Sequence, residues 1–247
     1  MSDSDAGIGA LPQVYLLDVE GTVAPIALVY DVMFPFARRH LGAFLTAHGA
    51  DSDVAADLAL LLRENQADRE APDSEAPYID GVADLAGAAA YLLWLMDQDR
   101  KSTALKAIQG RVWQAGFESG ELKGELFPDV APAIERWSEL GRVAIYSSGS
   151  VAAQRLFFRY SSAGDISGHI AAHFDTRVGA KRDPASYQRI AEELGVEPGS
   201  VLFFSDVVAE LDAARAAACG TRLVVRPGNS PVAEGHGHGV LSSFQGD

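Results

Sequence analysis

Three short apolar runs, each followed by polar side chains, constrain the fold of this 247-residue chain most strongly. They are residues 14–17 before Asp18, residues 142–146 before Ser147, and residues 201–204 before Ser205. Apolar runs of this length that alternate with helical patterns are typical of parallel strands covered on both faces. The sequence therefore predicts an α/β fold with a doubly wound, Rossmann-like parallel sheet, whose carboxyl edge carries the polar residues.

The strand and helix pattern continues to the end of the predicted sheet. Further strands are expected around residues 173–176 and 222–226, and helices over 131–140, 151–160, 184–194 and 208–218. We assign residues 12–28 and 122–227 to this α/β core.

Residues 29–121 show helical periodicity alone. The pattern predicts helices over residues 29–48, 51–70, 81–99 and 101–115, with Pro35 bending or restarting the first. So long a stretch exceeds an ordinary crossover connection between strands. We interpret it as an inserted all-helical domain whose methionines and aromatic residues form its own core.

The two ends of the chain are polar. Residues 1–11 form a short, acidic segment that is expected to be disordered. Residues 228–247 are expected to form a flexible tail. His236 and His238 in that tail could bind a metal, but a solvated end is the favoured interpretation. Cys219 is the only cysteine, which excludes an intramolecular disulfide, and we expect it to be buried.

The amino-acid composition limits the kinds of molecule that this protein can bind. With 34 acidic and 20 basic residues the formal charge is −14, so nucleic acid and anionic membranes would be repelled by most of the surface. A phosphorylated small molecule remains possible where a metal ion, a lysine or a helix N-terminus supplies local positive charge. We see no secretory signal pattern and no apolar run of bilayer length, so we expect a cytoplasmic protein.

Asp18 and Glu20 follow the first predicted strand and precede Gly21 and Thr22. Residues two apart in an extended chain point to the same side, so both carboxylates can face the edge of the sheet. Such a pair requires a divalent cation, or a division into a nucleophile and an acid. An ordinary acidic turn after a buried strand has the same local pattern.

The residue types at this edge suit phosphoryl transfer. Asp18 is the candidate nucleophile, and Asp206 is the second carboxylate for Mg²⁺, which prefers oxygen ligands. Glu20 is placed to protonate the leaving oxygen and later to activate water. Asp206 could instead cap the helix that follows it.

Ser147, Ser148 and Lys181 supply groups suited to a phosphate. The serines open a predicted helix, where hydroxyls and backbone N–H groups can contact phosphate oxygens. Lys181 lies in a loop after Gly179 and adds a fixed positive charge. The alternatives are a helix N-cap formed by residues 147–150 and a surface cation at Lys181.

Together these motifs resemble the haloacid dehalogenase superfamily of phosphatases, whose members often carry a helical cap. Most members have Asp-x-Asp in the first motif, whereas Glu20 here is similar to the enolase-phosphatase, or acireductone synthase, family. The resemblance covers residues 12–227 and weakens over 50–80. The motifs that carry it are Asp18–Thr22, Pro25–Ile26, Asp31–Ala37, Leu122–Gly124, Pro128–Val130, Ile145–Gln154, Phe174–Thr176, Val178–Lys181 and Ser205–Glu210.

The resemblance implies a bifunctional enzyme of methionine salvage. It would enolise 2,3-diketo-5-methylthiopentyl 1-phosphate and then remove the phosphate to give the acireductone, using one Mg²⁺ per subunit, as a monomer. The implied catalytic residues are Asp18, Glu20 and Lys181. The implied metal residues are Asp18, Asp206 and, through its backbone carbonyl, Glu20, and the implied substrate-binding residues are Ser147, Ser148 and Lys181.

Two other interpretations remain open at this point. One is a capped phosphatase of the same superfamily acting on a different small phosphate ester. The other is a binding or regulatory module that has kept the fold without catalysis.

Overall fold

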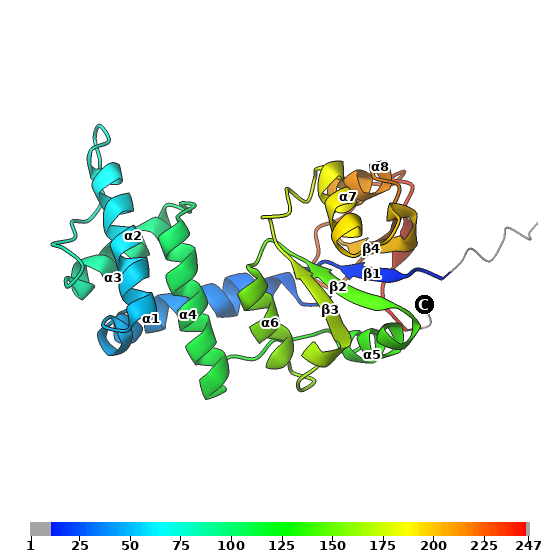
Figure 1. The fold of residues 1–247 in the computed structure, drawn as a ribbon, viewed down its shortest axis with the longest axis horizontal. Coiled ribbons are helices and arrows are strands. Elements are labelled where there is room, and N and C mark those ends of the chain that lie inside the picture. The colour runs from blue at the N-terminus through cyan, green and yellow to red at the C-terminus, as the bar shows by residue number, and fades with distance from the viewer. Residues whose placement is uncertain (1–10, 246–247) are drawn as a thin grey trace, which may run out of the picture. The chain divides into compact units, whose positions relative to one another are not determined.

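The computed structural model describes residues 11–245, which divide into two compact units. Among these residues, the core unit contains residues 11–28 and 123–245, and the helical unit contains Val29–Leu122 (Figure 1). The expectation for residues 1–11 lies, except for Leu11, outside the described residues. No helix in residues 11–245 is both long and apolar enough to cross a bilayer.

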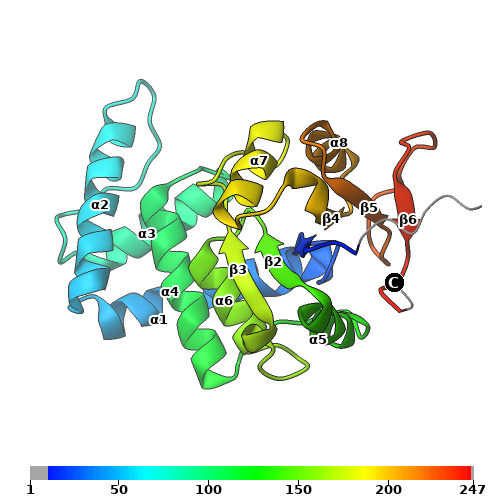
Figure 2. The same cartoon turned by 45° about the vertical axis from the view of Figure 1, so that its right-hand side comes forward.

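Within the described residues, the core unit holds one sheet of six parallel strands in the order β3-β2-β1-β4-β5-β6 (Figure 2). This confirms the predicted doubly wound sheet. The strands are β1 (Val14–Leu17), β2 (Arg142–Tyr146), β3 (Ile170–Phe174), β4 (Val201–Ser205), β5 (Gly220–Val224) and β6 (Gly239–Leu241).

Both faces of the sheet are covered, which explains why its central strands are continuously apolar. On one face, Tyr15 stacks on Trp137 at 5.1 Å between ring centroids, and Trp137 contacts Phe204 at 5.0 Å. On the other, Leu16 belongs to a buried cluster that includes Tyr187. The covering helices are α5 (Val130–Leu140), α6 (Val151–Arg159), α7 (Pro184–Glu193) and α8 (Val208–Ala216).

The helical unit has its own core. A π-helix over Leu28–Met33 leads into α1, which restarts at Phe34 with Pro35 in its first turn, as predicted for this proline. Two of the three helices that follow have a side-chain cap; the Ser102 hydroxyl, for example, accepts the Leu105 N–H. The helices are α1 (Phe34–His48), α2 (Ser52–Arg69), α3 (Leu85–Asp97) and α4 (Thr103–Ser119).

The strand register brings the polar strand ends to one level. Leu17 pairs with Ile145 of β2 on one side and with Phe204 of β4 on the other. Asp18 therefore leaves the sheet level with Ser205, where the strand order reverses between β1 and β4. This is the position at which doubly wound sheets form a ligand crevice.

The expectation of a flexible tail over residues 228–247 is wrong for most of its second half. β6 extends the sheet by pairing with β5, and the Phe244 side chain is fully buried against Trp137 and Phe204. The His238 side chain is also buried, and its ring contacts Thr221 and Asp212. Residues 246–247 lie outside the described residues.

A buried ion pair fastens this tail to the core. Arg226 Nη1 lies 2.8 Å from Asp129 Oδ2, and the same oxygen accepts the Phe244 N–H at 2.6 Å. Burial opposes ionisation of Asp129, yet these hydrogen bonds hold its pKa below the ordinary value. Arg226 also donates through Nε to the carbonyl of Thr22, so the tail is tied to the turn after β1.

We expect Arg226→Met to lower the free energy of unfolding of the core unit by about 3–5 kcal/mol, because it leaves the buried Asp129 carboxylate without its cation. Urea denaturation measures this change. Arg189→Met is the matched control, since Arg189 pairs with Asp183 at the surface and should contribute less than about 1 kcal/mol. Equal losses in the two variants would contradict the assigned role of the buried pair.

Candidate active site

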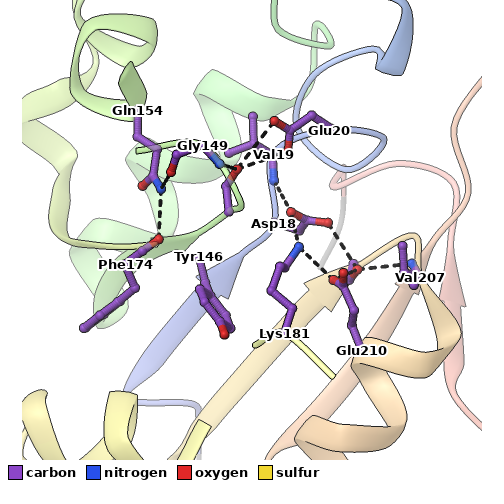
Figure 3. A network of polar contacts seen from close by, with 12 residues as sticks. Asp18, Val19, Glu20, Tyr146, Gly149, Gln154, Phe174, Lys181, Val207 and Glu210 are labelled. Carbon is purple, nitrogen blue, oxygen red and sulfur yellow. Dashed lines mark hydrogen bonds and ion pairs between the residues drawn. The ribbon is translucent and has the colours of Figure 1, made fainter. Parts of the chain in front are cut away.

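Asp18, Lys181 and Glu210 form a buried ionic cluster at the carboxyl edge of the sheet (Figure 3). Lys181 Nζ lies 2.5 Å from Asp18 Oδ1 and 2.7 Å from Glu210 Oε2. Ser205 at the end of β4 also links the two acids, because its Oγ lies 3.3 Å from Asp18 Oδ2 and 3.0 Å from Glu210 Oε2. These contacts fix the position of Asp18, and the Lys181 ammonium compensates its negative charge.

The electrostatics of the cluster follow from its burial. Burial disfavours the Lys181 ammonium, but the charges of Asp18 and Glu210 outweigh that effect and raise the pKa of Lys181 above its ordinary value. Burial and the charge of Asp18 raise the pKa of Glu210. Lys181 therefore stays charged, and the alternative of a surface cation is wrong because its side chain is only 11% exposed.

The loop that carries Lys181 is held by three hydroxyl groups. Consecutive carbonyls at residues 179, 180 and 181 each accept a hydrogen bond from a side chain on β2 or α7. The bonds are Tyr146 Oη to Gly179 O at 3.0 Å, Ser186 Oγ to Ala180 O at 2.8 Å, and Tyr187 Oη to Lys181 O at 2.6 Å.

Glu20 faces Ser147 across the crevice. The Ser147 hydroxyl lies 3.1 Å from Glu20 Oε2 and accepts the Gly149 N–H at 3.1 Å, so its own proton is directed to the carboxylate. Burial, followed by the charge of Asp18, raises the pKa of Glu20 above its ordinary value. A raised pKa makes a carboxyl a better proton acceptor and lets it hold a proton that it can later give.

Asp206 lies against the backbone of the β1 turn. A Cβ added at Gly21, where φ is +77°, would stand 2.3 Å from Asp206 Oδ2. Burial and the charge of Asp18 raise the pKa of Asp206 to about 7. α8 has no side-chain cap at its N-terminus, so Asp206 does not cap that helix.

The remaining predicted residues lie in the loop after β2. Ser147 is buried, and Ser148 beside it is exposed. Ser150 is the N-cap of α6 and accepts the Ala153 N–H at 3.3 Å, so the capping interpretation applies to that serine. The structure therefore brings together Asp18, Glu20, Ser147, Lys181 and Asp206.

A hard divalent cation fits the acidic side of the site. No three His, Cys, Asp or Glu side chains in the described part of the chain form a metal-binding group. Asp18 and Asp206, however, are oxygen donors close enough for one to raise the pKa of the other, which a cation between them would relieve. Carboxylate oxygens are the type of ligand that Mg²⁺ prefers.

Sequence reasoning did not assign roles to Glu210 and Ser205. Glu210 lies in the first turn of α8 and reaches Lys181, and Ser205 is the last residue of β4. An acid in the first turn of the helix that follows Asp206 was the available signal, because a side chain there lies near the strand end from which the helix starts.

The comparisons with known proteins agree with this site. Residues 12–218 match the family of haloacid dehalogenase-like hydrolases, and the chain belongs to that class of enzymes. Members of this phosphatase class generally use Mg²⁺.

Similar proteins narrow the class further. The chain is 51% identical to Enolase-phosphatase E1 of Synechococcus elongatus over 88% of this chain and 90% of that one. It is 46% identical to Enolase-phosphatase E1 of Sorangium cellulosum over 96% and 98% of the two chains. The solved UTR4 protein of Saccharomyces cerevisiae superposes with a TM-score of 0.78 at 35% identity, over 95% of this chain and 99% of that one. Within its class, the chain belongs to the enolase-phosphatase E1 family.

We expect Gly21→Ala to displace the Asp206 carboxylate and to lower phosphate release by at least about tenfold, which corresponds to about 1.4 kcal/mol of barrier. Gly164→Ala is the control, because Gly164 also has positive φ but a Cβ there meets nothing within 4 Å. That control should lose only about 1–2 kcal/mol of stability from backbone strain. Phosphate assays and urea denaturation distinguish the variants, and matching activities would contradict the predicted contact.

Proposed function

We propose that this chain enolises 2,3-diketo-5-methylthiopentyl 1-phosphate and then dephosphorylates it to the acireductone of methionine salvage. For a member of the enolase-phosphatase family, one observation supports this proposal most directly. Asp18, paired with the Lys181 ammonium, lies two residues before Glu20, whose pKa is raised. The first group suits nucleophilic attack and the second suits proton transfer.

In the phosphatase step, a carboxylate oxygen of Asp18 attacks phosphorus. The new O–P bond forms as the bond from phosphorus to the substrate oxygen breaks, and protonated Glu20 gives its proton to that leaving oxygen. Water then attacks the aspartyl phosphate, Glu20 takes a proton from the water, and the Asp18 carboxylate is restored with release of phosphate.

The phosphate oxygens need positive charge and hydrogen-bond donors. We assign Ser147, Ser148 and the backbone N–H groups that begin α6 to this role, together with Lys181. Because Lys181 already contacts Asp18, its ammonium offsets the repulsion between the nucleophile and an approaching phosphate.

We assign the metal to Asp18, Asp206 and the Glu20 backbone, one Mg²⁺ per chain. When bound there, Mg²⁺ neutralises negative charge on the phosphate and polarises carbonyl oxygens. In enolisation, Glu20 is the candidate base for the carbon-bound proton, because its raised pKa and its position in the crevice suit it to accept one.

The setting of the enzyme is also a proposal. The helical unit would be the cap domain of this class, residues 29–121, with residues 12–28 and 122–227 as the catalytic core. A formal charge of −14 supports an enzyme that binds neither nucleic acid nor anionic membranes. The family resemblance supports a cytoplasmic monomer.

Incubation with the diketone phosphate and Mg²⁺ tests the function. We expect the ultraviolet absorbance of the enol to rise first and inorganic phosphate to follow, and a chelator to suppress phosphate release. The alternative, a capped phosphatase for another small ester, predicts rapid turnover of general phosphate esters and poor turnover of the diketone phosphate, and that outcome would reject our substrate.

Asp18→Asn should lower phosphate release by a factor of about 10³ or more, about 4 kcal/mol of barrier, because an amide cannot form the phosphoryl intermediate. Circular dichroism should show an unchanged fold, since Asn keeps the size of Asp. Phosphate release at the wild-type rate would remove Asp18 from the nucleophile role.

A further inference from the structure

Gln154 is a buried side chain in α6, one turn after the serine loop that follows β2. Its Nε2 donates to the carbonyl of Gly149 at 2.8 Å and to the carbonyl of Phe174, at the end of β3, at 2.9 Å (Figure 3). Only the nitrogen end of the amide can donate to two carbonyls, so the orientation of the side chain is fixed.

The oxygen end of the same amide is also engaged. His173 Nδ1 lies 3.2 Å from Gln154 Oε1, and since that oxygen can only accept, the histidine carries its proton on Nδ1. Burial, with a further effect of Arg155, lowers the pKa of His173 to about 4, so the ring is neutral near pH 7. Both ends of the amide are therefore occupied, and Gln154 has a single well-defined position.

Both residues whose carbonyls Gln154 holds are hydrogen-bonded to Ser147. Phe174 O also accepts the Ser147 N–H at 3.2 Å. The Gly149 N–H donates to Ser147 Oγ, whose proton is directed to Glu20. One side chain thus joins the end of β3 to the loop whose hydroxyl faces the crevice.

The hydrogen bond from Gln154 matters because it is made to a glycine. A residue without a Cβ has a wide choice of backbone dihedral angles, so the peptides on either side of Gly149 are not fixed by local sterics. The hydrogen bond to Gly149 O restrains this loop from the side of α6, and the N–H of the same residue fixes the Ser147 hydroxyl.

We propose that Gln154 is a positioning residue for phosphoryl transfer, which sets the Ser147 hydroxyl toward Glu20 and the phosphate without touching substrate. The inference rests on the proposed function, because it assigns Gln154 to the second of two steps. Both proposed steps use Glu20, but only phosphoryl transfer also requires the phosphate that this loop would bind to be aligned with Asp18, so a shift of the loop slows that step more than enolisation.

The test compares the two steps within one enzyme. Enol formation, followed by ultraviolet absorbance, and phosphate release are measured at saturating diketone phosphate with Mg²⁺ for wild type and Gln154→Met, which keeps the length but loses the amide. We expect the ratio of phosphate release to enolisation to fall about tenfold. Loss of folded protein lowers both rates equally, so the ratio does not depend on how much of the variant is folded.

Gln154→Asn is a second test variant, because it keeps the amide but is one methylene too short to reach both carbonyls. Its ratio of phosphate release to enolisation should fall by less than that of Gln154→Met. Ser161→Ala is the matched control: it removes a buried hydrogen bond, Ser161 Oγ to Gly164 O, beyond the other end of α6. Its ratio should equal that of wild type.

The outcomes separate the inference from the proposed function. If wild type does not turn over the diketone phosphate, the proposed function fails. If wild type does so and Gln154→Met keeps the wild-type ratio, Gln154 has only a structural role and the inference is overturned.

Discussion

The site depends on one electrostatic constraint: the carboxylates of Asp18, Glu20, Asp206 and Glu210 converge on the same edge of the sheet. In the described residues, Lys181 is the cation that forms ion pairs with this group, and it contacts only Asp18 and Glu210. Burial and the charge of Asp18 raise the pKa values of the other three acids. Excess negative charge makes one side of the crevice receptive to a divalent cation, while Lys181 forms an ion pair with the nucleophile.

The fold supplies the rigidity that such a concentration of charge requires. The turn after β1 is held from behind, because Arg226 donates to the Thr22 carbonyl and Asn229 Nδ2 donates to the Gly21 carbonyl at 2.9 Å. Arg226 is itself fixed by Asp129, which also binds the backbone of Phe244. The last residues of the chain thus contribute to placing Asp18, more than two hundred residues earlier in the sequence.

Much of this could be predicted from sequence, since the apolar runs before Asp18, Ser147 and Ser205 determine a parallel sheet and its ligand-binding edge. The C-terminal strand was missed for a physical reason. β6 has three residues in a glycine-rich stretch, and Val240 is 56% exposed, so neither length nor alternation marks it as a strand. Hydrogen bonds from Gln154, Tyr146 and Tyr187 to loop carbonyls were equally hidden, because they depend on tertiary contacts that no local spacing encodes.

The glutamate at position 20, in place of the aspartate that the superfamily resemblance leads one to expect, has a geometric explanation. Its longer side chain extends from the β1 turn to the loop after β2, where Oε2 lies 3.1 Å from Ser147 Oγ. An aspartate would be shorter by about 1.5 Å, one carbon–carbon bond, which would carry the carboxylate beyond hydrogen-bond distance without a backbone shift. The added methylene therefore couples the acid to the serine loop that Gln154 holds, so the group suited to move protons and the groups suited to bind phosphate form one connected unit.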